Sequence, residues 1–179
     1  SSDFPILSES NGKINIVFAD LKNNLGGYFS PSDLFSKDLA PNSNERKTFY
    51  ISINSSKDHQ YSTIAHEFQH MIYFNELVSN NADSTNDTWI NEGFSTLAED
   101  LAGYGYKNID ANKYSIETYL NNPAEVSLIN WDVDFDNGDF RNYGSSYLFA
   151  RYIYDRFGSD IIKYLNDSPK GPKIDIEDF

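Results

Sequence analysis

The chain has 179 residues, the size of one folded domain, and its composition excludes several classes of function. Its 14 basic and 27 acidic residues give a formal net charge of −13, which argues against binding to nucleic acid or to an anionic membrane surface. Aromatic residues make up 16% of the chain, far too many for a disordered acidic segment. The absence of cysteine excludes disulfides, thiol catalysis and thiolate metal sites.

No apolar run approaches the roughly 20 residues that a membrane-spanning helix needs. The chain begins at Ser1 with neither an initiator methionine nor a recognisable signal peptide. We therefore expect a piece of a longer or processed protein, and its beginning gives no information on secretion.

The first third of the chain predicts strands. Residues 13–21 and 48–54 are rich in β-branched and aromatic side chains, and residues 26–29 form a shorter candidate between turn-forming residues. From about residue 58 to 79 the apolar spacing becomes helical. The apolar stripe of this helix, which we expect to enter the core, consists of Tyr61, Ile64, Ala65, Phe68 and Ile72.

Further helices are predicted over about residues 88–102, 111–120, 144–157 and 159–165, while residues 131–140 are aspartate-rich and irregular. Strands first and helices afterwards predict an α+β fold with the helices in a second lobe. We expect a single domain over residues 1–179, with an N-terminal lobe of about residues 1–80 and a helical C-terminal lobe of about residues 81–179.

His66, Glu67 and His70 form an H-E-x-x-H motif inside the helix predicted over residues 58–79. Positions four apart share one helix face, so both imidazoles can bind one Zn²⁺ while the glutamate lies beside the attacking water. Helical geometry turns the histidines away from the apolar stripe, towards a cleft. The alternative is a chance match on a surface helix, which is disfavoured because two of the three histidines of the chain fall in the motif.

A catalytic zinc ion needs a third protein ligand and an open coordination position. With no cysteine and only His59 to spare, a carboxylate is expected, and Glu92 follows His70 after 21 residues, enough for the chain to return antiparallel. Glu99 lies two helical turns beyond Glu92 and is a candidate acceptor for a ligand imidazole N–H, although it could also be a solvated surface charge. Thr96, one turn after Glu92, competes for that role. We expect His59 to be a surface residue.

Three segments together resemble the hyicolysin-type neutral metallopeptidases of the gluzincin clan. They are Ala-His-Glu-Phe-Gln-His-Met from Ala65, Trp-Ile-Asn-Glu-Gly-Phe from Trp89, and Tyr-Gly-Ser-Ser-Tyr-Leu-Phe from Tyr143. The resemblance spans roughly residues 13–165. It implies a two-lobed zincin fold, in which a mixed sheet and the active-site helix form the N-terminal lobe.

The same resemblance implies that His66, His70 and Glu92 hold one Zn²⁺ and that Glu67 is the general base. Related zinc aminopeptidases place a transition-state tyrosine fifteen residues before a helix-closing glycine, as Tyr143 precedes Gly158 here. Tyr143 is thus the candidate oxyanion donor. Tyr147 is the alternative, because the chain reads Tyr-Gly-Ser-Ser where those enzymes have Tyr-Glu-Lys-Gly, and both tyrosines could simply pack the helical lobe.

The resulting expectation is a zinc endopeptidase that hydrolyses protein or peptide substrates through an activated water. A zinc aminopeptidase is less favoured, because the Gly-x-Met-Glu-Asn segment of those enzymes is missing and Met71 is the only methionine. A catalytically silent zinc-containing binding module is the rival from another class. We expect a monomer that binds no nucleic acid, and the resemblance implies a secreted or cell-surface location in a bacterium.

Alternate aspartates at Asp132, Asp134 and Asp136, followed by Asp139, could converge on a Ca²⁺ ion. The pattern departs from an EF-hand, since its glycine is one place late and Tyr143 occupies the position of the last acidic ligand. The other interpretation is a solvated acidic loop at the rim of the cleft that favours basic side chains in substrates.

Overall fold

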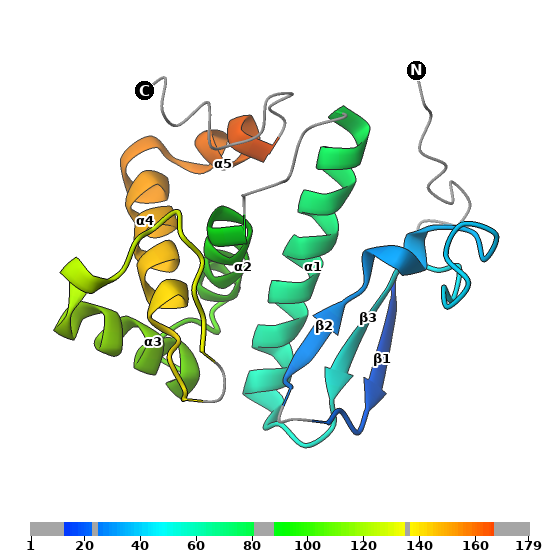
Figure 1. The fold of residues 1–179 in the computed structure, drawn as a ribbon, viewed down its shortest axis with the longest axis horizontal. Coiled ribbons are helices and arrows are strands. Elements are labelled where there is room, and N and C mark those ends of the chain that lie inside the picture. The colour runs from blue at the N-terminus through cyan, green and yellow to red at the C-terminus, as the bar shows by residue number, and fades with distance from the viewer. Residues whose placement is uncertain (1–12, 23–24, 81–87, 135–136, 167–179) are drawn as a thin grey trace.

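The computed structural model describes residues 13–22, 25–80, 88–134 and 137–166. In these residues a three-stranded sheet is followed by five α-helices, which confirms the predicted α+β fold (Figure 1). The long helix α1 (Lys57–Asn80) stands between the sheet and the other helices. None of the described helices is long and apolar enough to cross a membrane.

The sheet is mixed, with the strand order β1-β3-β2. Strand β1 (Asn15–Ala19) runs parallel to β3 (Thr48–Ser52), and β2 (Gly27–Phe29) runs antiparallel to β3. The strands are shorter than the sequence predicted at 13–21 and 48–54, because the parallel pairing extends over only five residues of each strand. The short strand expected within residues 26–29 is present as β2, at one edge of the sheet.

The loop between β2 and β3 is fixed to the sheet by a buried carboxylate. It begins with the 3-10 helix η1 (Pro31–Leu34), whose Asp33 accepts hydrogen bonds from the Tyr50 hydroxyl (2.8 Å) and from the backbone N–H of Asn44 (2.9 Å). Burial and the Asp33 carboxylate raise the pKa of Tyr50 to about 12. Strand β2 is thereby connected to β3 by a constrained loop.

The prediction that the apolar stripe of α1 enters the core is wrong for Tyr61 and Phe68, although Ile64 of the same stripe packs against the sheet. Tyr61 and Phe68 are 49% and 42% exposed, whereas Met71 packs with the sheet residues Phe49 and Ile51 in a buried cluster. The helix is covered on two sides, by the sheet and by α2 (Thr88–Leu101). Its histidine-bearing side therefore faces protein, and Tyr61 and Phe68 lie on the side that is left facing outwards.

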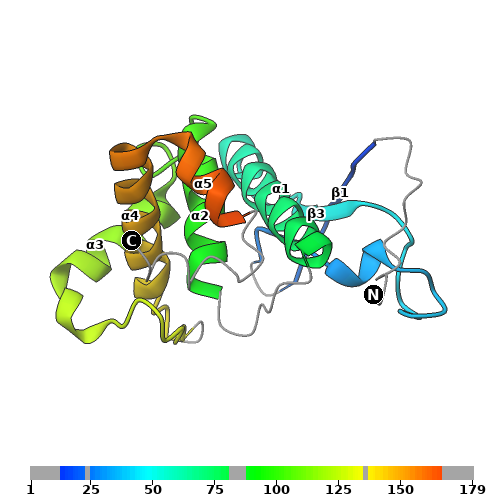
Figure 2. The same cartoon turned by 90° about the horizontal axis from the view of Figure 1, so that it is seen from above.

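The main core lies in the helical part, which also includes α3 (Asp110–Asn121), α4 (Arg141–Phe157) and α5 (Ser159–Asn166). Helix α4 packs against α2 and α3, and α5 contacts both α4 and α1 (Figure 2). The 3-10 helix η2 (Pro123–Glu125) and an irregular loop lead into α4. The largest buried side chains of this core include Trp89, Ile90, Phe94, Leu97, Tyr147 and Leu165.

Candidate metal centre

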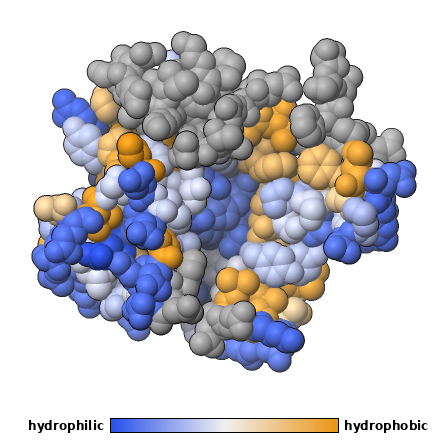
Figure 3. Space-filling model, in the orientation of Figure 1, coloured by the Kyte–Doolittle hydropathy of each residue, from blue (hydrophilic) through white to orange (hydrophobic). Residues whose placement is uncertain are grey.

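Helices α1 and α2 bring His66, His70 and Glu92 together. The Glu92 Oε2 atom lies 3.1 Å from His66 Nε2 and 3.6 Å from His70 Nε2. One potential ligand atom from each residue lies within 4.8 Å of the others, and within the described part of the chain this is the only such group of three or more. In the space-filling view, the surface between the sheet side and the helical side is hollowed and hydrophilic (Figure 3).

The arrangement follows from two polar stripes on facing helices. His66 and His70 are one turn apart on α1, and Glu92 lies on the side of α2 that faces them. Asn91, Glu92, Ser95 and Glu99 all lie within about one quarter of the circumference of α2, at 100° per residue. The apolar residues of the same helix turn to the core, so packing of α2 against α4 directs the polar stripe to α1.

The Nδ1 atom of His66 is engaged by a buried carboxylate. It lies 2.6 Å from Glu99 Oε1, and Glu99 is only 6% exposed. An ionised carboxylate can only accept, so Nδ1 donates to Glu99, and Nε2 is the nitrogen that faces Glu92. A metal ion would therefore bind at Nε2, in place of the proton that this nitrogen donates to Glu92 in the metal-free ring.

His70 has a different set of partners, which the sequence analysis did not identify. Its Nδ1 atom lies 3.0 Å from Asn91 Oδ1 and 3.1 Å from Ser95 Oγ. The amide oxygen of Asn91 accepts from the ring, which again leaves Nε2 available. The four-residue spacing of Asn91 and Ser95 beside Glu92 is the signal that could have revealed them.

The ionisation of the three candidate ligands is strongly coupled. Burial lowers the pKa of His66, but its hydrogen bonds to Glu92 and Glu99 more than offset this, and its pKa lies well above 6.5. Burial and the neighbouring His66 lower the pKa of His70. Burial acts to raise the pKa of Glu92, but its hydrogen bond to His66 and the charges of both histidines hold it below its ordinary value.

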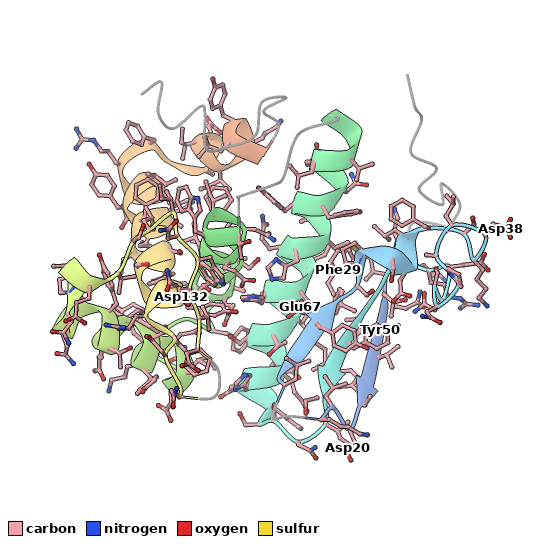
Figure 4. All side chains as sticks on the ribbon, in the orientation of Figure 1. Asp20, Phe29, Asp38, Tyr50, Glu67 and Asp132 are labelled. Atoms are coloured by element: carbon pink, nitrogen blue, oxygen red, sulfur yellow. The ribbon has the colours of Figure 1, made fainter. Side chains whose placement is uncertain are left out.

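Glu67 lies on the side of α1 that faces the sheet, next to Phe29 of β2 (Figure 4). It is 6% exposed, and its carboxylate accepts a hydrogen bond from the Phe29 backbone N–H. Burial, together with the negative charge of Glu92, raises the pKa of Glu67 to about 7. A carboxyl group in this range can both take up and release a proton near neutral pH.

The two candidate tyrosines on α4 lie in different surroundings. Tyr143 packs against Trp131 and Phe140, and burial with the charges of Glu92 and Glu67 raises its pKa. The Tyr147 hydroxyl instead donates to Asp100 Oδ2 at 2.9 Å, and its ring belongs to the main core. Of these two tyrosines, Tyr143 is the one whose pKa is raised by the charge of the candidate ligand Glu92.

The remaining predicted residues do not join the cluster. Thr96 is buried in α2, but the imidazole N–H groups are taken by Glu99 and by Asn91 and Ser95. His59 lies in the first turn of α1, next to Gly26, and is partly exposed.

The aspartates considered for calcium do not form a metal-type group within the described residues. Asp132 and Asp134 are exposed, and Asp136 lies outside the described residues. Asp134 accepts hydrogen bonds from Asn137, and Asp139 is paired with Arg141 at 2.8 Å. Calcium binding at this loop therefore stays a prediction.

The donor set of the cluster fits a zinc ion. Two imidazoles and one carboxylate are the ligands of a common class of catalytic zinc site, and each imidazole has its second nitrogen bonded to an oxygen acceptor. Three protein ligands leave a coordination position for water or substrate.

A comparison with known proteins gives the chain a metalloprotease relationship. It is 34% identical over 167 residues to the neutral metalloprotease ShpI of Staphylococcus hyicus. The match covers 81% of this chain and 35% of that protein, so the chain spans about a third of the length of this curated relative. No family model and no solved structure matches the chain. A metalloprotease relationship implies a metal ion, and the His66–His70–Glu92 cluster has the ligands to bind one.

Proposed function

We propose that the chain is the catalytic part of a zinc endopeptidase of the hyicolysin type, in the gluzincin clan. The observation that carries the proposal is the convergence of His66, His70 and Glu92 within 4.8 Å, with Glu67 buried beside them on the same helix as the two histidines. The 34% identity to a neutral metalloprotease supports it independently of the geometry.

In this proposal His66 and His70 bind the zinc ion through Nε2 and Glu92 binds it through its carboxylate. When bound, zinc supplies Lewis-acid chemistry, which polarises the scissile carbonyl and makes water more acidic. Glu99 and Asn91 hold the two imidazoles in the tautomer that leaves each Nε2 lone pair free.

Glu67 is proposed as the general base and then the general acid. Its carboxylate takes a proton from the attacking water as that water adds to the carbonyl carbon of the substrate. The resulting carboxylic acid then returns the proton to the amine of the breaking C–N bond. A pKa of about 7 suits both steps, because neither protonation state is strongly disfavoured near neutral pH.

Tyr143 is proposed as the donor to the oxyanion that forms when water adds. Its phenol is protonated at neutral pH, since burial and the surrounding carboxylates raise its pKa. The ring of Tyr143 packs against Trp131 and Phe140, which restricts its orientation, and preorganised donors act most strongly in sites shielded from water.

Strand β2 is the proposed binding strand for an extended substrate. The Ser52 N–H donates to the Gly26 carbonyl, so Gly27 and Phe29, one and three residues later, turn their main-chain groups to the edge of β2 that no other described strand covers. The Phe29 N–H at this edge already reaches Glu67, which locates the edge next to the proposed base. A peptide that pairs with this edge would pass the metal cluster in extended form.

The open edge favours an endopeptidase over an aminopeptidase, because an extended chain can continue past the site in both directions. The missing Gly-x-Met-Glu-Asn segment agrees with this choice. A silent binding module is less favoured, since all the residues that the proposed mechanism uses are present. The proposed setting is a secreted or cell-surface bacterial enzyme that acts on proteins or peptides as a monomer.

The test compares the wild-type chain with the Glu67→Gln variant on casein and on a quenched-fluorescent peptide library. Both proteins are assayed with zinc, after chelation, and after zinc is restored. We expect cleavage within peptides by the wild-type chain, loss on chelation and recovery with zinc. Loss of the general base should lower kcat by on the order of 10²–10⁴-fold while bound zinc is unchanged.

Bound zinc with no cleavage by the wild-type chain, and hence no difference between it and Glu67→Gln, would instead support the binding module. Release of single N-terminal residues only would support the aminopeptidase. Both outcomes overturn the endopeptidase proposal.

A further inference from the structure

The carboxylate of Glu99 is held from its far side by residues on two other helices. Its Oε1 atom faces His66, whereas Oε2 accepts a hydrogen bond from the Ser62 hydroxyl and a second from Asn112 Nδ2 at 2.8 Å. Ser62 is on α1, one turn before His66, and Asn112 is in the first turn of α3. Three helices therefore meet at one buried carboxylate.

Such donors restrict the rotation of a carboxylate. A glutamate held only through Oε1 can turn about its last torsion, which has a broad energy profile, and can then lose alignment with the imidazole. Two donors at Oε2 fix the carboxylate plane, and they also stabilise its charge in a place where Glu99 is 6% exposed. Asn112 is uncharged, so its hydrogen bond stabilises the Glu99 carboxylate without altering the net charge of the cluster.

Helix α3 also contacts the helix that carries Tyr143. A Cβ atom on Gly144 would lie 2.2 Å from the Ser115 carbonyl oxygen, so α4 approaches the backbone of α3 directly beside Tyr143. Ser115 is three residues after Asn112, which places both contacts within about one turn of α3. The same turn of α3 thus contacts the His66 side of the centre and the Tyr143 side.

We propose that Asn112 is a positioning residue for the metal centre, which acts through Glu99 to hold the imidazole of His66 in place for metal binding. The proposal rests on the proposed function for its catalytic consequence, but its effect on metal binding can be measured without any substrate. Asn112 does not touch the ligand atoms, so its removal changes the centre only through the carboxylate of Glu99.

The experiment uses Asn112→Leu, which keeps the approximate shape of the side chain and removes the donor, with Asn112→Ala as a second variant. The matched control is Asn121→Ala, at the exposed far end of the same helix. Zinc affinity is measured by competition with a chromophoric chelator, and the cobalt-substituted proteins are compared by visible absorption. Unfolding of each metal-free protein in urea reports on the fold itself.

We expect both Asn112 variants to bind zinc on the order of tenfold more weakly than the wild type. Mutation of residues that hydrogen-bond to metal ligands commonly weakens metal binding by such a factor. The cobalt spectrum should change in band position or intensity, whereas Asn121→Ala should match the wild type in both measurements. In a Glu99→Ala background, Asn112→Leu should cause no further loss, because residues that act through one another are not additive.

Wild-type zinc affinity and an unchanged cobalt spectrum in a folded Asn112→Leu protein would overturn the proposal. A full additional loss in the Glu99→Ala background would also overturn it, because Asn112 would then act by another route. If the wild-type chain binds zinc but cleaves no substrate, the proposed function is wrong. The zinc affinities and cobalt spectra of the variants then still decide whether Asn112 positions the metal centre. Kinetics add a further check in an active enzyme, where kcat should fall while KM stays near the wild-type value.

Discussion

Glu67 and Glu99 are both 6% exposed, yet their surroundings prepare them for different tasks. Both oxygens of Glu99 are bound by side-chain groups, so this carboxylate is fixed in place. Glu67 accepts a backbone hydrogen bond from Phe29, and burial raises its pKa to about 7. A fixed anion suits the orientation of an imidazole, whereas a carboxyl group that titrates near neutrality suits proton transfer.

The raised pKa of Glu67 predicts a pH-dependent cost in the metal-free protein. Its folded pKa of about 7 exceeds the ordinary value of 4.5, so the protonated form stabilises the fold below pH 4.5 and this stability is lost as the pH rises through 7. Above that pH the buried charge costs about 3 kcal/mol. We therefore compare the free energies of unfolding of Glu67→Gln and the wild type in urea without metal. The stability of the variant relative to the wild type should rise by about 3 kcal/mol from about pH 4.5 to about pH 8.5. A stability difference that stays constant with pH would contradict this interpretation.

Removal of the Tyr143 hydroxyl tests its proposed role as the oxyanion donor. Tyr143→Phe should lower kcat by on the order of 10²–10³-fold with little change in KM, since the hydroxyl is needed only when the oxyanion forms. Steady-state kinetics on one quenched peptide measures both constants.

Tyr147→Phe is the matched control, because its hydroxyl donates to Asp100 instead. It should lose some stability and keep its kcat. Equal effects of the two substitutions on kcat would leave Tyr143 without the proposed role.

The elements show what a single sequence can and cannot predict. The apolar stripe of α1 predicts the buried side only in part, because such a stripe marks the core reliably only when one face of a helix is covered. This helix is covered by the sheet and by α2, so Tyr61 and Phe68 remain on the outward side. The motif spacing of His66 and His70 does not depend on which side is buried, so it still located the cluster.

The contacts that hold the imidazoles depended on packing between elements. Glu99 could be proposed from its spacing to Glu92, because both residues lie on one helix. Asn112 could not, since it comes from α3 and meets Glu99 only after three helices have packed. Sequence spacing gives relations within a helix, whereas partners on different helices follow from tertiary structure.

Strand β2 approaches α1 closely at Gly27, and this contact can be tested by mutation. A Cβ atom on Gly27 would lie 2.5 Å from Thr63 Cγ2 and 2.6 Å from the Tyr50 carbonyl oxygen. Gly27→Ala should therefore push β2 away from the helix and cost about 1–3 kcal/mol in urea unfolding. Because β2 also carries the proposed substrate edge, peptide cleavage should fall with it.

Gly26→Ala is the neighbouring control. A Cβ at this position would meet His59 Nε2 at 3.2 Å, the far end of a side chain that can move. This variant should be much closer to the wild type in stability and activity. If the two alanine variants are equally stable, the packing of β2 against α1 does not depend on the glycine.

In the whole molecule, the proposed centre lies between α1 and α2, and α1 packs both in the sheet cluster and in the main core. Figure 1 shows α1 between the sheet and the other helices. The order of strands and helices is enough to predict the α+β class, whereas the division into lobes near residue 80 stays a prediction. The strand order β1-β3-β2 could not be read from the sequence, because three short strands pair in several ways that satisfy the same apolar pattern. The single-domain prediction stays a prediction, and the chain spans 35% of the curated relative.

The most direct test of the account is zinc K-edge X-ray absorption on the chain after loading with zinc and exhaustive dialysis. We expect one zinc ion per chain, nitrogen and oxygen ligands at about 2.0–2.1 Å, and multiple scattering from two imidazoles. Replacement of Glu92 by glutamine should weaken retention of the ion through dialysis. A chain that retains no zinc, or zinc whose spectrum lacks imidazole scattering, would contradict the His66–His70–Glu92 centre on which the proposed function depends.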